Sequence, residues 1–265
     1  MTPSGPSAAV HVEMPAHLAA GYKSPSQRAR VVTEAWISEN MYCPACDLDT
    51  LERLPPNVRV ADFCCDGCKE QYQLKSQSKP LRGRILDSAY KPLRRAIDTG
   101  TVPSFLLMHY RGRTWRVADL LAVPGHFMTE SVIEERPPLA LTARRAGWVG
   151  CNILLDRLPD DGRIPVITSE HVVPKENVRE AWQRFAFLDK KTAEVRNWTV
   201  EILACVRRLG KTAFTLEEMY AFEHDLRTLH PANRHVKDKI RQQLQVLRNH
   251  GILKFVRRGT YELIQ

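Results

Sequence analysis

The sequence of 265 residues contains no apolar run near the roughly 18 residues that a membrane-spanning helix needs. Its first residues, MTPSGPSAAVHVEMP, lack the basic start and the apolar stretch of a secretion signal. We therefore expect a cytoplasmic, bacterial-type intracellular protein with no membrane association. Hydrophobic residues make up 43% of the chain and charged residues 26%, which is the balance of a soluble globular protein.

Acidic residues are in short supply: 30 Asp and Glu stand against 39 Lys and Arg, which gives a net charge of +9. Such an excess favours a polyanionic partner, most simply nucleic acid, although many basic proteins bind none. The chain also has seven cysteines. Without a secretion signal, they indicate a metal site or structural thiols more than a disulfide framework.

Four of the cysteines form two C-x2-C pairs. Cys43 and Cys46 make CPAC, Cys65 and Cys68 make CDGC, and residues 47–64 separate the pairs. This spacing is typical of a structural zinc site, because two tight turns can direct four thiolates at one tetrahedral ion. A redox C-x-x-C motif is the alternative, but two pairs disfavour it. Cys64 directly precedes Cys65 and could replace it as a ligand.

The chain divides into three predicted parts. Residues 1–20 are rich in Pro, Ala and Ser without periodicity, and we expect a flexible extension. Residues 21–190 mix helix signals, beginning at Ser24-Pro25, with apolar strand candidates such as SFLLMHY, WVGCNILL and RIPVIT, and a further helix is expected around DSAYKPLRRAID. This predicts an α/β domain. Residues 191–265 are predicted to be helices followed by a hairpin.

The C-terminal part has the element order of a winged helix. Thr215 and Glu218 form a capping-box pattern. Farther on, apolar residues repeat at helical spacing, and basic residues lie on the opposite face; the apolar set is Val236, Ile240, Leu244 and Leu247. Residues 233–258 contain eight Lys or Arg and one Asp, and they include the expected recognition helix and wing. DNA binding is therefore predicted, with a solvated charged face as the alternative.

A second constellation of residues surrounds the second cysteine pair. Asp62 ends the alternating segment VRVADF, and Gln73 and Lys75 lie two apart in QYQLK, so they share one face of a strand. Together they form D-x10-Q-x-K, a variant of the D-x(n)-(D/E)-x-K arrangement of restriction-type nucleases. Alone the pattern is weak. Cys65 and Cys68 lie between the two segments, so a zinc ion there would fix the hairpin that carries the candidates.

Motifs spread from Tyr22 to the C-terminus closely resemble those of the DpnI-like, methyl-directed type II restriction endonucleases. They include YKSPSQRARVVTEAW, ADFCCDGC, QLKS, PLALTARRAGWVGCNI, FTLEEMYAFEHDL and KDKIRQQLQVLR. The resemblance implies a PD-(D/E)xK core with an embedded zinc site, followed by a winged-helix domain. It also implies magnesium-dependent double-strand cleavage of DNA at GATC sites that carry N6-methyladenine. Manganese is expected to substitute for magnesium, and a monomer is expected in solution.

Carried over by position, Asp62 is the first magnesium ligand, Gln73 stands at the second ligand position and Lys75 is the catalytic lysine. Gln73 departs from the family pattern, in which this ligand is acidic, so a lower magnesium affinity is expected. Glu70 has odd spacing from Gln73 and would point to the opposite face unless a bulge re-aims it. Glu34 is a further candidate for a supporting ligand, with a solvated helical residue as the simpler interpretation.

Reading a methylated adenine requires an apolar surface in the major groove. Trp148 is the candidate, and a core tryptophan is the alternative. Arg144 and Arg145 are expected to contact phosphate or guanine, and Gly147 to permit a close approach of the backbone. In the C-terminal part the predicted DNA contacts are Arg234, Lys237, Arg241 and Arg258.

The leading hypothesis is an endonuclease dependent on methylated DNA. The runner-up is a zinc-containing winged-helix reader or regulator of methylated DNA whose cutting activity is weakened through Gln73. A zinc-bearing RNA-binding or structural protein is disfavoured, because a basic helix and wing suit a duplex major groove better.

Overall fold

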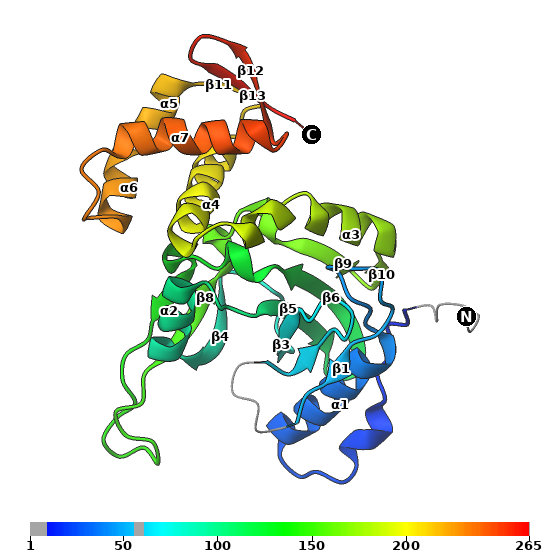
Figure 1. Ribbon diagram of the computed structural model, residues 1–265. Coiled ribbons are helices and arrows are strands. Elements are labelled where there is room, and N and C mark those ends of the chain that lie inside the picture. The colour runs from blue at the N-terminus through cyan, green and yellow to red at the C-terminus, as the bar shows by residue number, and fades with distance from the viewer. Residues whose placement is uncertain (1–9, 56–60, 265) are drawn as a thin grey trace. The chain divides into compact units, whose positions relative to one another are not determined.

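The computed structural model describes residues 10–55 and 61–264, and Figure 1 shows their course. The chain forms two compact units, which are Met1–Ile85 with Pro103–Gly125 and Asp161–Phe185, and Leu86–Val102 with His126–Asp160 and Ala186–Gln265. Because the units interleave along the chain, the division at residue 190 stays a prediction. Within the described ranges, no helix combines the length and the apolar character that a membrane crossing requires.

A seven-stranded sheet forms the centre of the first unit. Its order is β1-β2-β3-β5-β6-β9-β10. The strands are β1 (Glu52–Arg53), β2 (Phe63–Cys64), β3 (Gln71–Gln77), β5 (Ser104–Arg111), β6 (Arg116–Val123), β9 (Ile164–Thr168) and β10 (His171–Val172). Only β3 and β5 are parallel among these neighbours, and the other pairs are antiparallel. The predicted strands at QYQLKS, SFLLMHY and RIPVIT are confirmed. The mixed sheet with its helices confirms the α/β class.

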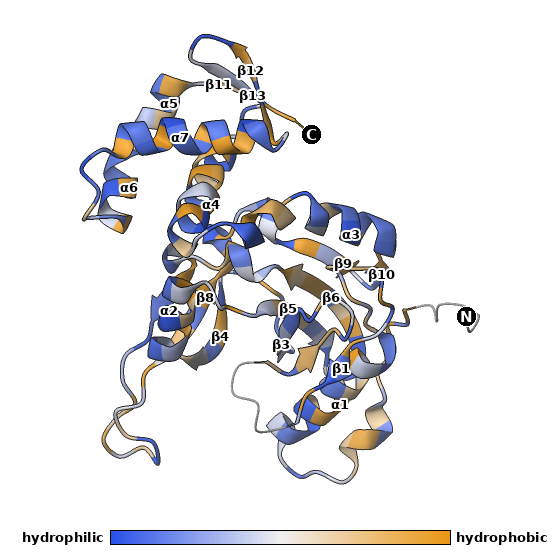
Figure 2. Ribbon diagram, in the orientation of Figure 1, coloured by the Kyte–Doolittle hydropathy of each residue, from blue (hydrophilic) through white to orange (hydrophobic). Residues whose placement is uncertain are grey.

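Two helices, α1 (Pro25–Asn40) and α3 (Lys175–Gln183), contribute to the core of this unit. Val32 and Trp36 of α1 are fully buried and share a cluster with Tyr72 of β3 and Trp182 of α3. The predicted helix start is confirmed, since Pro25 is the first helical residue. Figure 2 shows the same pattern, with orange apolar residues along the strands and mixed colours on the helices.

The N-terminal segment differs from the expectation. Residues 1–9 lie outside the described ranges, but residues 10–20 pack against the sheet: Val12 and Met14 are buried, and η1 (Ala16–Ala19) follows. Glu13 forms a β-bridge with Arg116, and the two side chains form an ion pair. The apolar residues Val12 and Met14 lie between polar ones at strand spacing, which supplies the buried face.

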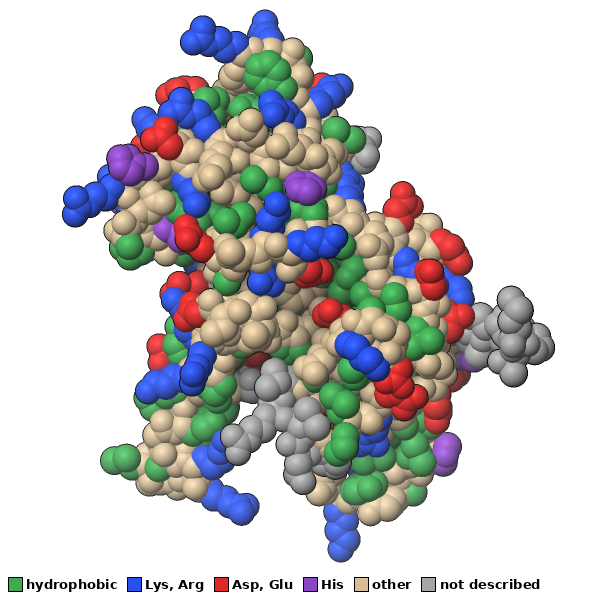
Figure 3. Space-filling model, in the orientation of Figure 1, with side chains coloured by type: hydrophobic (Ala, Val, Ile, Leu, Met, Phe, Trp, Pro, Cys, Tyr) green, Lys and Arg blue, Asp and Glu red, His purple; other side chains and the backbone are tan. Residues whose placement is uncertain are grey.

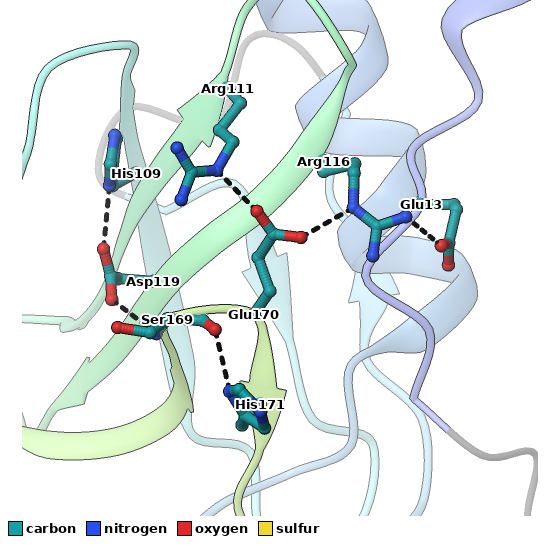
Figure 4. Close-up of polar contacts among 8 residues, drawn as sticks. All are labelled: Glu13, His109, Arg111, Arg116, Asp119, Ser169, Glu170 and His171. Carbon is teal, nitrogen blue, oxygen red and sulfur yellow. Dashed lines mark hydrogen bonds and ion pairs between the residues drawn. The ribbon is translucent and has the colours of Figure 1, made fainter.

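Ion pairs extend from this bridge to the end of the β5–β6 hairpin and the turn between β9 and β10 (Figure 4). The Arg116 Nε donates to Glu170 at 2.7 Å, and Arg111 pairs with the other oxygen of the same carboxylate. Glu170 lies in the tight turn between β9 and β10, with a positive φ of 65°. Two arginines of the β5–β6 hairpin thus fix this turn, and Arg116 also fixes the N-terminal segment.

The second unit contains a three-stranded sheet of order β4-β8-β7, with β4 (Arg84–Ala89), β7 (Ile133–Glu135) and β8 (Gly150–Leu154). Helix α2 (Tyr90–Thr99) follows β4 directly, so the predicted helix begins three residues later than DSAYKPLRRAID suggested. The predicted strand WVGCNILL is confirmed as β8. Short 3-10 helices complete the connections at η2 (Gly125–Phe127), η3 (Glu130–Val132), η4 (Leu155–Arg157), η5 (Asp160–Gly162) and η6 (Ala186–Lys190).

The C-terminal residues form helices and a wing. The elements are α4 (Ala193–Arg208), β11 (Ala213–Thr215), α5 (Leu216–Tyr220), α6 (Glu223–Leu229), α7 (Val236–Asn249), β12 (Leu253–Arg257) and β13 (Thr260–Leu263). The strands pair in the order β11-β13-β12. The helix that begins after Thr215, α5, ends at Tyr220, and α6 follows it as a separate helix. The helix order and the terminal hairpin confirm the predicted winged-helix arrangement.

Local sequence signals explain these elements. The Thr215 hydroxyl accepts from the Glu218 amide, and the Glu218 carboxylate accepts from the Thr215 amide, which confirms the capping box. All four apolar residues of the predicted α7 stripe, Val236, Ile240, Leu244 and Leu247, are buried. Gly251 ends α7 with a φ of 71°, a left-handed conformation that suits glycine.

Candidate functional site

The two cysteine pairs meet in space. The sulfur atoms of Cys43, Cys46, Cys65 and Cys68 all lie within 4.8 Å of one another. The Cys43–Cys68 and Cys46–Cys65 sulfur distances are 3.6 Å and 3.5 Å. A tetrahedral ion with bonds of about 2.3 Å needs sulfurs about 3.8 Å apart, so the four thiols fit zinc. Cys64 lies outside this group, and its sulfur faces the Cys65 carbonyl oxygen at 3.7 Å.

Side chains from β3 and α3 support this cluster. The Tyr72 hydroxyl of β3 lies 3.1 Å from the Cys43 sulfur. From α3, the Arg179 guanidinium donates to the carbonyl oxygens of Cys43 and Leu48, and the Gln183 amide donates to that of Ala45 at 2.6 Å. Burial raises the pKa of the Cys43 thiol well above its ordinary value. A bound cation would offset that cost by stabilising the thiolate.

The three candidates of the D-x10-Q-x-K pattern lie around the strand that follows the cysteines. Strand β2 pairs with β3 so that Phe63 faces Tyr72, and extending this register by one pair sets Asp62 opposite Gln73. The first half of the predicted strand VRVADF, residues 58–60, lies outside the described residues. Lys75 follows two residues after Gln73 on the same face of β3.

Asp62 is fixed by the backbone of β3. Its Oδ2 accepts the Leu74 amide at 2.8 Å, and its own amide donates to the Tyr72 carbonyl at 2.9 Å. Burial raises the pKa of the Asp62 carboxyl above its ordinary value, and the negative charge of Glu34 adds to the rise. The Leu74 amide, Lys75 and Arg30 act in the opposite direction on this pKa. A carboxylate oxygen is the type of ligand that a hard divalent ion prefers.

The two other carboxylates considered from the sequence have separate partners. Glu70 accepts the Ser104 hydroxyl at 2.6 Å, and Ser104 pairs with Tyr72 in the register, so Glu70 serves the face opposite to Gln73. Glu34 is only 6% exposed, and both of its oxygens accept from arginines, Arg30 and Arg53. The interpretation of Glu34 as a solvated helical residue was wrong.

The sequence matches two family models. Residues 10–191 match DpnI, the Dam-replacing family, and residues 194–263 match DpnI_C, the Dam-replacing HTH domain. The first match alone covers more than half of the 265 residues.

The chain belongs to the Dam-replacing (DpnI) family. Membership supports a methylation-dependent restriction enzyme in general terms, and the HTH domain supports DNA binding. The match to the DpnI-like endonucleases inferred from the sequence is thus confirmed at the level of the family. The described cysteine cluster, which could hold a zinc ion, lies within the first matched segment.

In this Dam-replacing protein, Trp148 lies on the loop between β7 and β8. The loop closes through hydrogen bonds between Leu139 and both Trp148 and Gly147. Trp148 is half-buried, with the Arg145 guanidinium 4.6 Å from its ring centroid. The ring packs on the backbone of Gly150, where an added Cβ would lie 2.7 Å from it, whereas the space beside Gly147 is open within 4 Å among the described residues, so its close approach to DNA stays a prediction. Gly147 serves the turn, with a φ of 75°.

The same loop carries exposed groups. Arg144 and Arg145 are exposed, and Leu141 is 92% exposed. Residues 136–149 contain three arginines and no acidic residue. An apolar side chain on a basic loop matches the surface of a duplex, which combines phosphates with apolar groove atoms.

The predicted contacts of the HTH domain lie at α7 and the wing. Figure 3 shows several Lys and Arg side chains, in blue, over this part of the chain. Arg234, before α7, and Arg258, in the wing turn, are exposed. Lys237 lies 3.6 Å from Glu223 and stacks on Tyr220, while Arg241 pairs with Asp238. DNA phosphates would compete with these acidic partners for Lys237 and Arg241.

Proposed function

We propose that the protein is a type II restriction endonuclease that cleaves both strands of DNA at GATC sites carrying N6-methyladenine. Membership of the Dam-replacing family supports the general activity. The observation that carries the proposal is the position of Asp62, which is hydrogen-bonded to β3 and lies opposite Gln73 when the β2–β3 register is extended by one pair. Cys65 and Cys68 of the cysteine cluster lie in the same hairpin, and a zinc ion there would fix it. This arrangement fits a PD-(D/E)xK nuclease.

Magnesium is the proposed catalytic ion, with manganese as a substitute. The donor set fits, because Asp62 offers a carboxylate oxygen and Gln73 an amide oxygen, and both are hard donors. When bound, the ion would supply charge stabilisation at the phosphate and a more acidic water. Lys75, on the same face of β3 as Gln73, would orient the attacking water in line with the phosphorus. Gln73 brings no charge, so weaker magnesium binding is part of the proposal.

Methyl recognition is assigned to Trp148. Its half-buried ring offers apolar surface, and Arg145 covers part of it. Arg144 and Arg145 would contact phosphate or guanine, and the HTH domain would contribute Arg234, Lys237, Arg241 and Arg258. Replacing Trp148 with Ala is expected to lower the preference for methylated over unmethylated duplex more than it lowers thermal stability. The reverse result would make Trp148 a core residue.

The catalytic assignment is tested with Asp62→Asn and Lys75→Ala. Both variants should bind methylated duplex with the affinity of the unmodified protein, because the changes leave the DNA-contacting residues intact. Both should fail to cut it in magnesium. Normal cleavage by the two variants would refute the assignment.

A second function is favoured by one observation, the uncharged Gln73. In this alternative the protein is a reader or regulator of methylated DNA with weakened cutting. Tight, methyl-dependent binding without cleavage in magnesium or manganese would support it. The proposal also retains a catalytic domain at residues 21–190, a winged-helix domain at 191–265 and a monomeric state, which sedimentation of the full chain would test.

A further inference from the structure

A buried carboxylate holds two arginines beside Asp62. Glu34, on α1, is 6% exposed, and its Oε1 accepts from the Arg30 Nε at 2.7 Å. Its Oε2 accepts from the Arg53 Nη2, on β1. These groups and Asp62 line one small pocket, together with Leu54, Pro55 and Ala61. The pocket therefore joins one helix, one strand and the carboxylate proposed to bind magnesium.

The arginines remain available to a ligand. Their side chains are 59% and 47% exposed, although Glu34 between them is buried. Each guanidinium has five N–H donors, and Glu34 engages one donor of each, the Arg30 Nε and an Arg53 Nη2. Glu34 raises the pKa of Arg30, and Asp62 adds to this rise, so Arg30 lies within electrostatic range of Asp62.

Stability alone does not account for this arrangement. An ion pair with an exposed arginine contributes little, whereas burying a carboxylate is costly. Two arginines anchored on one buried carboxylate, however, supply the donors that a phosphate takes, because guanidinium groups bind phosphate through paired hydrogen bonds. Both oxygens of Glu34 already accept from arginines, so a metal ion would have to compete with these hydrogen bonds for the carboxylate.

We infer that Arg30 and Arg53 form a clamp for a DNA backbone phosphate next to the scissile one, with Glu34 as the positioning residue. The inference rests on the proposed nuclease function. In this inference Glu34 binds the two arginines and is not a magnesium ligand. Substitution at Glu34 should therefore raise KM for DNA and leave the magnesium requirement unchanged.

The test compares Arg30→Gln, Arg53→Gln and Glu34→Gln in the full chain, with Arg28→Gln as the control. Arg28 is an exposed arginine on the same helix. Each clamp variant should raise KM for methylated duplex about tenfold, the effect of losing one charged hydrogen bond, with the half-saturating magnesium concentration unchanged. Arg28→Gln should change KM less than twofold.

A duplex with single methylphosphonate substitutions near the cut identifies the phosphate. Neutralising the clamped phosphate should raise KM of the unmodified protein about tenfold. It should cause no further rise in KM for the Arg53→Gln variant. Unchanged KM in both arginine variants would overturn the clamp. So would a Glu34→Gln protein with a raised magnesium requirement and a normal KM, which would make Glu34 a metal ligand.

Failure of the nuclease proposal is separable from failure of the clamp. If the unmodified protein cuts nothing, the same variants and methylphosphonate duplexes are compared by equilibrium binding. In binding too, we expect each clamp variant to lose affinity about tenfold. The methylphosphonate should weaken binding by the unmodified protein about tenfold and cause no further loss in the Arg53→Gln variant. Equal binding by all the variants would overturn the clamp. Because Glu34→Gln places an amide in a buried, charge-paired site, which costs stability, the exposed Arg30 and Arg53 variants carry the decision.

Discussion

The Tyr72 hydroxyl should tune the affinity of the cysteine cluster for zinc. Tyr72 is fully buried on β3, and its hydroxyl lies 3.1 Å from the Cys43 sulfur. Burial raises the pKa of this hydroxyl far above its ordinary value, so it remains a donor at working pH. A hydrogen bond to a charged acceptor contributes about 1.5–3 kcal/mol. At about 1.4 kcal/mol per tenfold, Tyr72→Phe should weaken zinc binding about ten- to hundredfold.

The assay is competition for zinc between the full chain and a chromophoric chelator at fixed pH. Tyr42→Phe is the matched control, because Tyr42 directly precedes Cys43 in the chain and its hydroxyl is buried without a hydrogen-bond partner among the described residues. It should leave zinc affinity unchanged. Phe retains the Tyr72 ring, which lies 6.0 Å from the Trp182 ring, so packing is preserved. Unchanged affinity in Tyr72→Phe, or an equal loss in Tyr42→Phe, would refute the reasoning.

Three further predictions concern other parts of the chain. Gln73→Glu should lower the half-saturating magnesium concentration of cleavage about tenfold, since it adds a charge at the metal; a higher magnesium requirement would contradict the assignment. Leu141→Ser should weaken binding to methylated duplex severalfold without changing the unfolding temperature. The control variant, Val172→Ser on β10, should bind as the unmodified protein does. A lower unfolding temperature of Leu141→Ser would show that Leu141 supports the fold. The pKa of Glu218 is lowered to about 2 by Lys211 and the Thr215 amide, so its stabilising effect is present above about pH 4.5 and is lost as pH falls toward 2. Glu218→Gln should remove that part of the acid dependence of thermal unfolding, and an unchanged pH profile would count against the lowered pKa of Glu218.

Features set by local spacing could be predicted from the sequence. The C-x2-C pairs need only tight turns to converge, so Cys43, Cys46, Cys65 and Cys68 were identified without a structure. Helix α7 could be predicted for a similar reason, because a stripe of apolar residues at helical spacing must be buried. The capping box at Thr215 depends on residues three apart.

Features set by contacts between residues far apart in the chain could not be predicted from the sequence. Glu34 lies two residues from both Val32 and Trp36, so helical periodicity places it away from the buried face. It is buried nonetheless, with Arg53 of β1 bound to its carboxylate, and no local pattern reports that contact. The packing of the Trp148 ring on Gly150 similarly depends on how the loop folds back onto β8.

The most direct test of the central claim uses one plasmid in two forms, adenine-methylated and unmethylated at GATC. Each form is incubated with the purified protein and magnesium, and the products are separated on a gel. Discrete fragments from the methylated form alone are predicted, with none from the Asp62→Asn protein. Equal cutting of both forms, or no cutting of the methylated form in magnesium or manganese, would contradict a methylation-dependent nuclease.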